Sequence, residues 1–307
     1  MTAPLPAVPV VSDQWDQALY AFLVEKGNRS GSKRTVESYS RMLWRFFSDT
    51  TPDRVTPAVV LAYAHGIGLS GRPPSPVTIA ARIACLSSYF RFLIRMGLMT
   101  SNPCDLVERP RTSPSPARGY SADEVKRLLD VVPDTIRGRR DRAILLVFIL
   151  TGRRRSEVMG MTAGDIEIEG GTVFYRYRGK GNKQGRRELP RPAWEAIRLT
   201  LGDCGKELAT MAPEESLWQA GAGSKGISGS TFYARFRRYL VEAGLQPTGL
   251  HILRHSAAKL RRDAGESVET VSAFLDHSSL AVTTTYLRRL EGVEDHSSER
   301  VAESIGL

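Results

Sequence analysis

Two histidine-rich segments stand close together near the carboxyl end of this 307-residue sequence. Residues 250–260 read LHILRHSAAKL, and residues 275–290 read LDHSSLAVTTTYLRRL, in which Tyr286 follows His277 by nine positions. A phenol has a pKa near 10, so it is a weak nucleophile at neutral pH unless neighbouring cations stabilise the phenolate. The combination of imidazoles, Arg254 and a phenol therefore indicates an attack on an anionic ester such as a phosphodiester.

Such an attack needs positive charge at the phosphate and a route for protons. Two guanidinium groups can hold the non-bridging oxygens without a metal, because each planar fork donates two hydrogen bonds. His251 and Arg254 are three residues apart, so on a helix they lie on one face. The segment TGRRRSE at 151–157 offers further arginines, and GKGNK at 179–183 offers lysines that can protonate a leaving sugar hydroxyl. A phosphotyrosine formed in this way stores the bond energy, so strands can be exchanged without ATP.

Other kinds of site fit these segments less well. His251 and His255 have the spacing of a zinc-binding helix, but Ile252 stands where such enzymes carry a glutamate, and a third ligand is not evident. His255 is more typical of a packed or capping residue. The GKG segment lacks the rest of a phosphate-binding loop. The three cysteines are Cys85, Cys104 and Cys204. Their spacing fits neither a zinc site nor a disulfide framework, which favours a reducing cytosolic compartment.

Charge and hydropathy restrict the partners. The formal net charge is +10 and the sequence pI about 9.7, which favours a polyanionic partner such as nucleic acid. The longest apolar run, residues 143–150, is eight residues, far short of the roughly 20 that span a bilayer. The amino terminus has no charged region followed by an apolar one, so a secretory signal is not expected. We expect a cytoplasmic protein that does not enter membranes.

The amino-terminal part is expected to be a flexible tail (1–11) followed by a helical DNA-binding domain (12–107). Apolar residues at spacings of three and four predict four helices, at about 13–26, 33–48, 57–66 and 76–96. The second helix carries a basic face, and in so basic a chain we expect it to contact the DNA backbone: Arg34, Arg41 and Arg45.

Residues 108–119, ERPRTSPSPARG, read as a linker because prolines sustain neither a helix nor a central strand. Ser121 and Glu124 then form a capping box, which places a domain boundary near residue 115 and a second domain at 120–307. That domain is expected to be mostly helical, with three short strands at 165–168, 172–178 and 186–190. Glycine-rich turns, the second of them GKGNKQG, connect the strands. Later helices are expected at about 191–201, 229–243, 251–264 and 267–274.

TGRRRSE, GKGNK, HxLRH and LDHSSLAVTTTY, in this order, resemble the motifs of the tyrosine recombinases, the phage-integrase and Xer-type family. The resemblance covers nearly the whole chain. It implies a mainly α fold with a small antiparallel β-sheet, built from a four-helix, SAM-like core-binding domain and a carboxyl-terminal catalytic domain. It also implies a site-specific recombinase that cleaves and rejoins double-stranded DNA through a 3′-phosphotyrosine, without metal or other cofactor. Four protomers are then expected to assemble on two DNA sites.

The resemblance assigns roles to seven residues. Arg154 matches the first catalytic arginine, Glu157 its acidic support, and Lys180 the hairpin lysine. His251 and Arg254 match the HxxR pair, His277 the second histidine, and Tyr286 the nucleophile. Arg153 and Arg155 flank Arg154 where many members have apolar residues, so its assignment rests on the pattern TGxRxSE. An extra glycine in QGRREL leaves Lys183 as an alternative to Lys180, and the proton-transfer roles of Lys180 and His251 stay open.

Two further segments have expected roles in binding. The helix STFYARFRRYLVEAG has an apolar face of Phe232, Phe236 and Tyr239. In the family the equivalent helix lies near the major groove, so Arg235 and Arg238 are expected to contact bases or phosphates. The tail after Tyr286 is expected to dock on a neighbouring protomer through Val293, Val301 and Ile305.

A DNA-binding protein of the same fold without catalysis, and an enzyme of the type IB topoisomerase kind, are the alternative functions. The target site stays open, as does the choice between phage integration, transposon movement and dimer resolution. Accessory proteins are equally open, and we expect the protein to act on the nucleoid.

Overall fold

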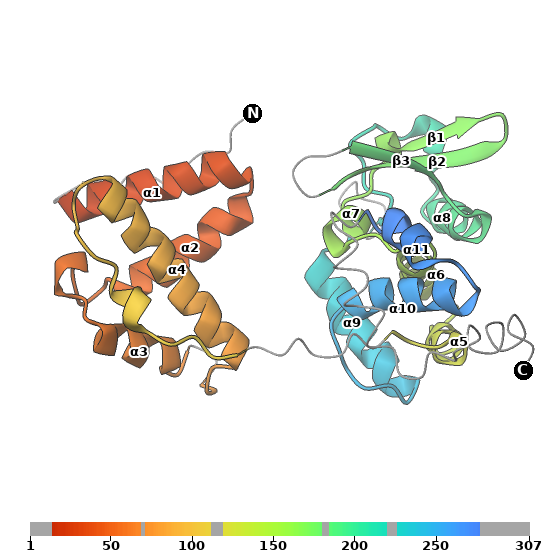
Figure 1. Cartoon of the computed structure of the whole chain (residues 1–307). Helices are drawn as coiled ribbons and strands as arrows, with labels where there is room; N and C mark the ends of the chain where they lie inside the picture. The colour runs from red at the N-terminus through yellow and green to blue at the C-terminus, as the bar shows by residue number, and fades with distance from the viewer. Residues whose placement is uncertain (1–13, 69–70, 112–118, 180–183, 220–225, 277–307) are drawn as a thin grey trace, which may run out of the picture. The chain divides into compact units, whose positions relative to one another are not determined.

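The computed structural model divides the chain into two compact units, residues 1–114 and 115–307 (Figure 1). It describes residues 14–68, 71–111, 119–179, 184–219 and 226–276. Several residues with expected roles lie outside this part of the chain: Lys180, Lys183, His277, Tyr286, Val293, Val301 and Ile305.

The described residues of the first unit form four α-helices: α1 (Gln14–Ser30), α2 (Lys33–Phe46), α3 (Pro57–His65) and α4 (Pro76–Arg95). Ser32, Thr56 and Ser75 start the last three helices, because each side chain accepts a hydrogen bond from a backbone N–H of the first turn. Short 3₁₀ turns at Pro52–Arg54 and Pro103–Leu106 complete the unit.

Helix α1 runs four residues beyond its expected end. Gly27, the residue after the expected end, is helical, and a Cβ there would lie 3.3 Å from a methyl group of Val36 on α2. The helix stops before Gly31, whose left-handed φ of 59° suits a residue without a side chain. Gly27 therefore serves close helix packing and does not end α1.

Helix α4 is the core helix of the first unit. By length and composition alone it is the one helix in the described ranges that passes as a membrane span. Its residues Ile83, Leu86 and Phe90 are, however, buried completely in the same apolar cluster as Phe22 of α1 and Leu43 of α2. This packing accounts for its apolar composition.

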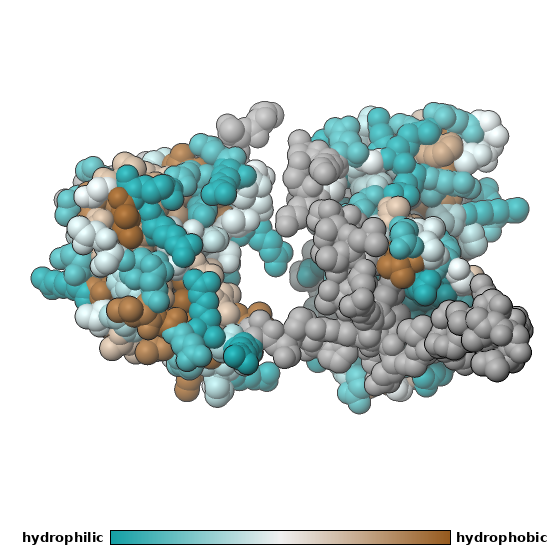
Figure 2. All heavy atoms as spheres, in the orientation of Figure 1, coloured by the Kyte–Doolittle hydropathy of each residue, from teal (hydrophilic) through white to brown (hydrophobic). Residues whose placement is uncertain are grey.

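The second unit places helices around a small sheet. Its helices are α5 (Ala122–Asp130), α6 (Ile136–Thr151), α7 (Arg155–Met159), α8 (Arg191–Asp203), α9 (Gly229–Glu242), α10 (His251–Asp263) and α11 (Val268–Phe274). The strands β1 (Ile166–Glu169), β2 (Thr172–Arg178) and β3 (Gln184–Glu188) form one antiparallel sheet in the order β1-β2-β3. The mainly helical fold with a small antiparallel sheet is confirmed. On the displayed face of the first unit, hydrophilic residues lie among smaller hydrophobic areas (Figure 2).

Strand β3 begins two residues earlier than the sequence analysis placed it. Gln184 and Gly185 belong to the strand and not to the preceding turn, and Gly185 pairs with Tyr177 of β2. A Cβ at Gly185 would lie 2.3 Å from the Tyr177 ring. The glycine is therefore needed because the aromatic ring lies across the strand at that point.

Helix α9 is fixed to α6 by a buried charge. Asp141 of α6 has no exposed surface; it accepts hydrogen bonds from Arg235 Nη1 at 3.2 Å and from the Tyr239 hydroxyl at 2.8 Å. Phe232, Phe236 and Tyr239 are buried, which confirms the expected apolar face of α9. Arg238, in contrast, is largely exposed and is 3.4 Å from Glu242.

We predict that Arg235→Ala and Arg238→Ala differ sharply in stability. Arg235→Ala removes a partner of a buried carboxylate and should lower the free energy of unfolding by about 2–3 kcal/mol. Arg238→Ala loses an exposed ion pair and should change it by less than about 0.5 kcal/mol. Urea unfolding followed by circular dichroism measures both. Equal stabilities for the two variants would contradict the structural role of Arg235.

Candidate active site

The turn after α6 is built around Gly152. This residue caps α6 with a left-handed φ of 61°, and its N–H donates to the Phe148 carbonyl at 2.9 Å. A Cβ at Gly152 would lie 2.8 Å from side-chain atoms of both Leu275 and Phe274. Only glycine lets the end of α11 pack against this turn, so the next three residues, all arginines, start from a fixed position.

The three arginines have different environments. Arg153 is buried, Arg154 is half-buried, and Arg155 is exposed. Glu157, itself buried, accepts from Arg154 Nη1 at 2.9 Å and from the Arg154 backbone N–H at 2.9 Å. One carboxylate thus holds both the backbone and the side chain of Arg154 and limits how far its guanidinium can move.

Arg254 of α10 lies beside Arg154 and is only 4% exposed. Its Nη1 donates to the Gly152 carbonyl at 2.7 Å, and its Nη2 donates to the Leu275 carbonyl at 2.5 Å. Burial, with the positive charges of Arg154 and Arg153, lowers the pKa of Arg254 to about 10. The guanidinium is therefore still cationic at neutral pH, in a place where positive charge is costly and an anion would be stabilised.

His251 begins α10 on the same face as Arg254. Its side chain is exposed on one side, but the protein around it removes part of its hydration. This desolvation, with the charges of Arg254 and Arg154, lowers the pKa of His251 below its usual value. The imidazole is thus neutral at physiological pH and able to accept a proton. The His255 ring packs edge-on against it, with ring centroids 4.5 Å apart.

The structure therefore brings Arg154, Glu157, His251 and Arg254 together at one place in the second unit. The described residues contain no group of three or more His, Cys, Asp or Glu side chains that could hold a metal. Of the arginines expected to contact DNA, Arg34, Arg41 and Arg45 are exposed on α2 of the first unit, and Arg238 is exposed on α9 of the second. Arg235 already pairs with Asp141.

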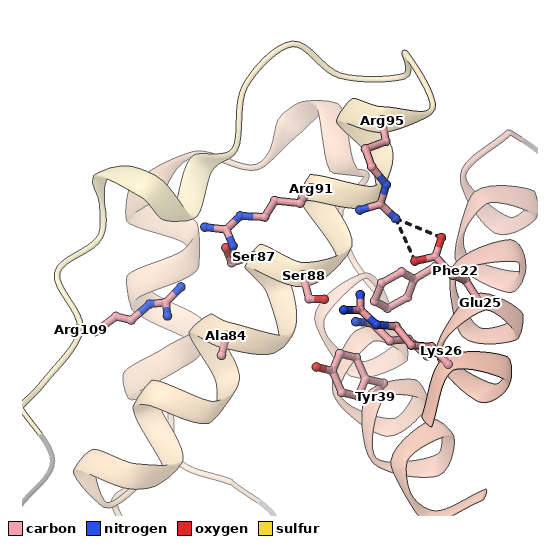
Figure 3. A pocket seen from close by; sticks show the side chains of 11 residues that line it. Phe22, Glu25, Lys26, Tyr39, Ala84, Ser87, Ser88, Arg91, Arg95 and Arg109 are labelled. Atoms are coloured by element: carbon pink, nitrogen blue, oxygen red, sulfur yellow. Dashed lines mark hydrogen bonds and ion pairs between the residues drawn. The ribbon is translucent and has the colours of Figure 1, made fainter. Parts of the chain in front are cut away.

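Sequence reasoning missed a basic pocket in the first unit (Figure 3). Helices α1, α2 and α4 enclose about 330 Å³, with Lys26 Nζ 5.2 Å from the ring centroids of both Phe22 and Tyr39. Arg95 is held by Glu25 at 2.8 Å. The cations of the pocket are Lys26, Arg29, Arg91, Arg95 and Arg109. These cations come from three separate segments. Helical periodicity reveals a basic face on one helix, such as that of α2, but not a cluster formed between segments.

Sequence reasoning also missed Asp276, whose carboxylate accepts hydrogen bonds from three side chains in the second unit: Arg153, Tyr177 and Arg187. The residues come from four segments, so their spacing in the sequence gives no sign of the contact.

Comparison with known proteins places this geometry in a family. The model of the Phage integrase family matches residues 120–292. The tyrosine recombinase XerC of Syntrophus aciditrophicus is 32% identical over 233 residues, covering 72% of this chain and 74% of that protein. The tyrosine recombinase XerD of Listeria innocua is 27% identical over 285 residues, covering 90% and 94%.

Solved structures show the same fold. The XerH site-specific recombinase bound to a palindromic difH substrate aligns with a TM-score of 0.67 at 16% identity, over 97% of this chain and 91% of that one. A lambda integrase dimer bound to a COC′ core site aligns with a TM-score of 0.64 at 19% identity, over 88% and 76%. From the family model and the XerC similarity together, the chain belongs to the phage integrase family of tyrosine recombinases.

Proposed function

We propose that this chain is a site-specific DNA recombinase that cleaves and rejoins strands through a 3′-phosphotyrosine at Tyr286. The observation that carries the proposal is the buried Arg254 guanidinium beside Arg154 and a neutral His251. A protein that only binds DNA contacts phosphates with exposed cations and has no need for a desolvated one. The relatives named as tyrosine recombinases support the same activity.

In this proposal Arg154 and Arg254 hold the scissile phosphate. Burial weakens screening by water, so their charges act more strongly on the negative charge that develops at the phosphate in the transition state. Glu157 keeps Arg154 in place, and the Gly152 and Leu275 carbonyls keep Arg254 in place. No metal is required, because guanidinium and imidazole groups supply the positive charge and the hydrogen bonds.

The chemical step forms one ester bond to phosphorus, breaks another, and moves two protons. The Tyr286 oxygen attacks phosphorus, and the bond from phosphorus to the 5′ oxygen of the next nucleotide breaks. His251 accepts the phenol proton, and Lys180 donates a proton to the leaving oxygen. His277 completes the set around the phosphate, and Lys183 is the alternative donor. The reverse reaction, with a 5′-hydroxyl from another strand, rejoins the DNA without ATP.

We propose further that four protomers act on two DNA sites in the cytoplasm, on the nucleoid, with the tail after Tyr286 docked on a neighbour. A lambda integrase tetramer bound to a Holliday junction is among the similar solved structures. On α9, Arg238 suits DNA contact better than Arg235, because Asp141 already neutralises Arg235. The exposed arginines of α2 and the basic pocket of the first unit are the proposed phosphate contacts there.

Tyr286→Phe tests the nucleophile. The change removes the hydroxyl but keeps the ring, so DNA affinity should change by less than about twofold while covalent attachment is lost. The wild type, incubated in EDTA with fragmented genomic DNA and then with nicked duplexes of the sequence recovered, should form an adduct that survives SDS. Mass spectrometry should find the 3′-phosphate on the peptide that contains Tyr286.

Tyr233→Phe is the matched control, because it removes the half-buried phenol of a tyrosine on α9; its adduct should form at the wild-type rate. An undiminished adduct in Tyr286→Phe would show that another residue is the nucleophile. If the wild type formed no adduct on any DNA, the binding-only function would be favoured. An adduct that required added zinc or magnesium would contradict the proposed charge stabilisation.

Arg91→Glu tests the basic pocket of the first unit. Arg91 lines the pocket, and its side chain is 64% exposed and lies 3.8 Å from Asp105, so the charge is available to a phosphate. Reversing this charge should weaken duplex binding about tenfold at 0.1 M salt. It should also reduce the slope of log K against log salt concentration by about one, the value for one phosphate contact. Arg54→Glu makes the same charge change outside the pocket lining. Equal losses in both variants would refute a localised contact.

A further inference from the structure

Asp276 receives more side-chain hydrogen bonds than an exposed carboxylate usually does. Its two oxygens accept from Arg153 Nη1, from the Tyr177 hydroxyl at 2.6 Å and from Arg187 Nη2 at 2.8 Å. Burial alone would raise the pKa of Asp276, but these hydrogen bonds outweigh burial and lower the pKa to about 2. The carboxylate is therefore charged at every pH at which the protein works.

The backbone at Asp276 is unusual as well. Its φ of 51° is the only positive value for a residue other than glycine in the part of the chain that the structure describes. Left-handed backbone disfavours most side chains, although Asp and Asn tolerate it. A glycine would fit this backbone with less strain but would bring no carboxylate. Aspartate here points to a use for the side chain.

Arg153 is the partner on the turn after α6. It is only 1% exposed, its Nε donates to the Thr151 carbonyl at 3.1 Å, and its Nη2 donates to the Phe274 carbonyl. Its guanidinium carbon lies 4.3 Å from the Tyr177 ring centroid. A buried guanidinium held by carbonyls and a ring still needs an anion, and Asp276 supplies it.

The other two partners come from the β2–β3 hairpin. Tyr177 reaches Asp276 because its ring lies over Gly185, where a Cβ would clash. Arg187 of β3 donates to the Ala273 carbonyl at 2.7 Å as well as to Asp276. The hairpin is thus tied to the end of α11 by two side chains that meet at one carboxylate.

Each of these segments is next to a proposed catalytic residue in the sequence. Arg153 precedes Arg154, strands β2 and β3 flank residues 180–183, and Asp276 precedes His277. A structural role alone, as a charge cluster that stabilises the fold, is the simpler explanation of the contacts. It does not explain why one carboxylate, on a strained backbone, joins the three segments that must converge on one phosphate.

We propose that Asp276 is a positioning residue for strand cleavage: with Arg153, Tyr177 and Arg187 it forms a latch that aligns these three segments. The latch consists of those four residues. It rests on the proposed function, because the alignment matters only if the segments act on a phosphate together. Misplacement of reacting groups by about 1 Å can slow a reaction about 100-fold, so a loosened latch should act on rate more than on binding.

The test measures two quantities for each variant: the rate constant of adduct formation on nicked duplex at saturating protein, and the dissociation constant for intact duplex. Asp276→Asn replaces the carboxylate by an amide of the same shape, on a residue type that also tolerates the left-handed backbone, and Tyr177→Phe removes one hydroxyl. Both should slow adduct formation about 10- to 100-fold while the dissociation constant changes by less than about twofold. Rates within twofold of wild type in both variants would overturn the latch.

Asp203→Asn is the matched control. The Asp203 carboxylate also accepts two hydrogen bonds from an arginine, Arg139, whose Nε and Nη2 lie at 2.7 and 2.9 Å. Arg139 is near the start of α6, at the opposite end of the helix from Gly152. Asp203→Asn should reduce stability without slowing adduct formation. If Asp203→Asn slowed the reaction as much as Asp276→Asn did, general destabilisation would be the cause and the latch would be refuted.

A double variant of Arg153 and Asp276 distinguishes a loss of alignment from the effect of an unpaired buried charge. Asp276→Asn alone leaves a buried cation unpaired, whereas Asp276→Asn combined with Arg153→Met removes both charges. The latch predicts that the double variant stays slow, no slower than the slower single variant. Recovery of the wild-type rate in the double variant would show that only the unpaired charge mattered. If Asp276→Asn does not fold, Tyr177→Phe and the double variant decide.

Failure of the latch and failure of the proposed function give different results. If the wild type forms the adduct and Tyr286→Phe does not, the function stands, and normal rates in the latch variants overturn the latch alone. If the wild type forms no adduct, the function fails first, and the latch falls with it.

Discussion

The packing of the second unit depends on the buried guanidinium of Arg254, which is only 4% exposed. A buried cation must find hydrogen-bond acceptors, and Arg254 finds the carbonyls of Gly152 and Leu275. These carbonyls stand at the carboxyl ends of α6 and α11, where helices leave acceptors without an internal partner and carry partial negative charge. One side chain of α10 thus satisfies two helix ends and fixes three helices around one point.

The same constraint explains the electrostatics of the site. Around this point the described residues place four guanidinium groups against two carboxylates, Glu157 and Asp276; the guanidinium groups belong to Arg153, Arg154, Arg187 and Arg254. The two carboxylates hold Arg153, Arg154 and Arg187 in position, but the four cations outnumber them. Desolvation and the remaining positive charge lower the pKa of His251, and the same positive charge leaves the site ready for an anion such as a phosphodiester.

Local signals in the sequence were sufficient for much of this structure. Apolar spacing placed the starts of α2, α3 and α4, where serine or threonine side chains cap the helices, and the i,i+3 spacing placed His251 and Arg254 on one face. Local signals failed where a residue acts through a distant partner. Gly27 continues α1, and Gly185 lies in β3, because each packs against a side chain of another element.

The same limit applies to the charged groups. Arg235 looked like a surface cation of an amphipathic helix, but Asp141, 94 residues away, pairs with it. Arg153 and Asp276 are 123 residues apart, and no periodicity links them. Their contact depends on how the turn after α6 meets the end of α11, which only the folded chain determines.

The central claim is that Arg154 and Arg254 neutralise one scissile phosphate, and a neutral phosphate analogue tests it most directly. A nicked duplex with a methylphosphonate at the scissile position lacks the negative charge that the arginines are proposed to stabilise. Arg154→Ala should form almost no adduct on the phosphate but recover adduct formation on the methylphosphonate. Arg155→Ala, which alters the exposed neighbour, should behave like wild type on both substrates. If Arg154→Ala stayed as slow on the methylphosphonate as on the phosphate, the account of the site would be contradicted.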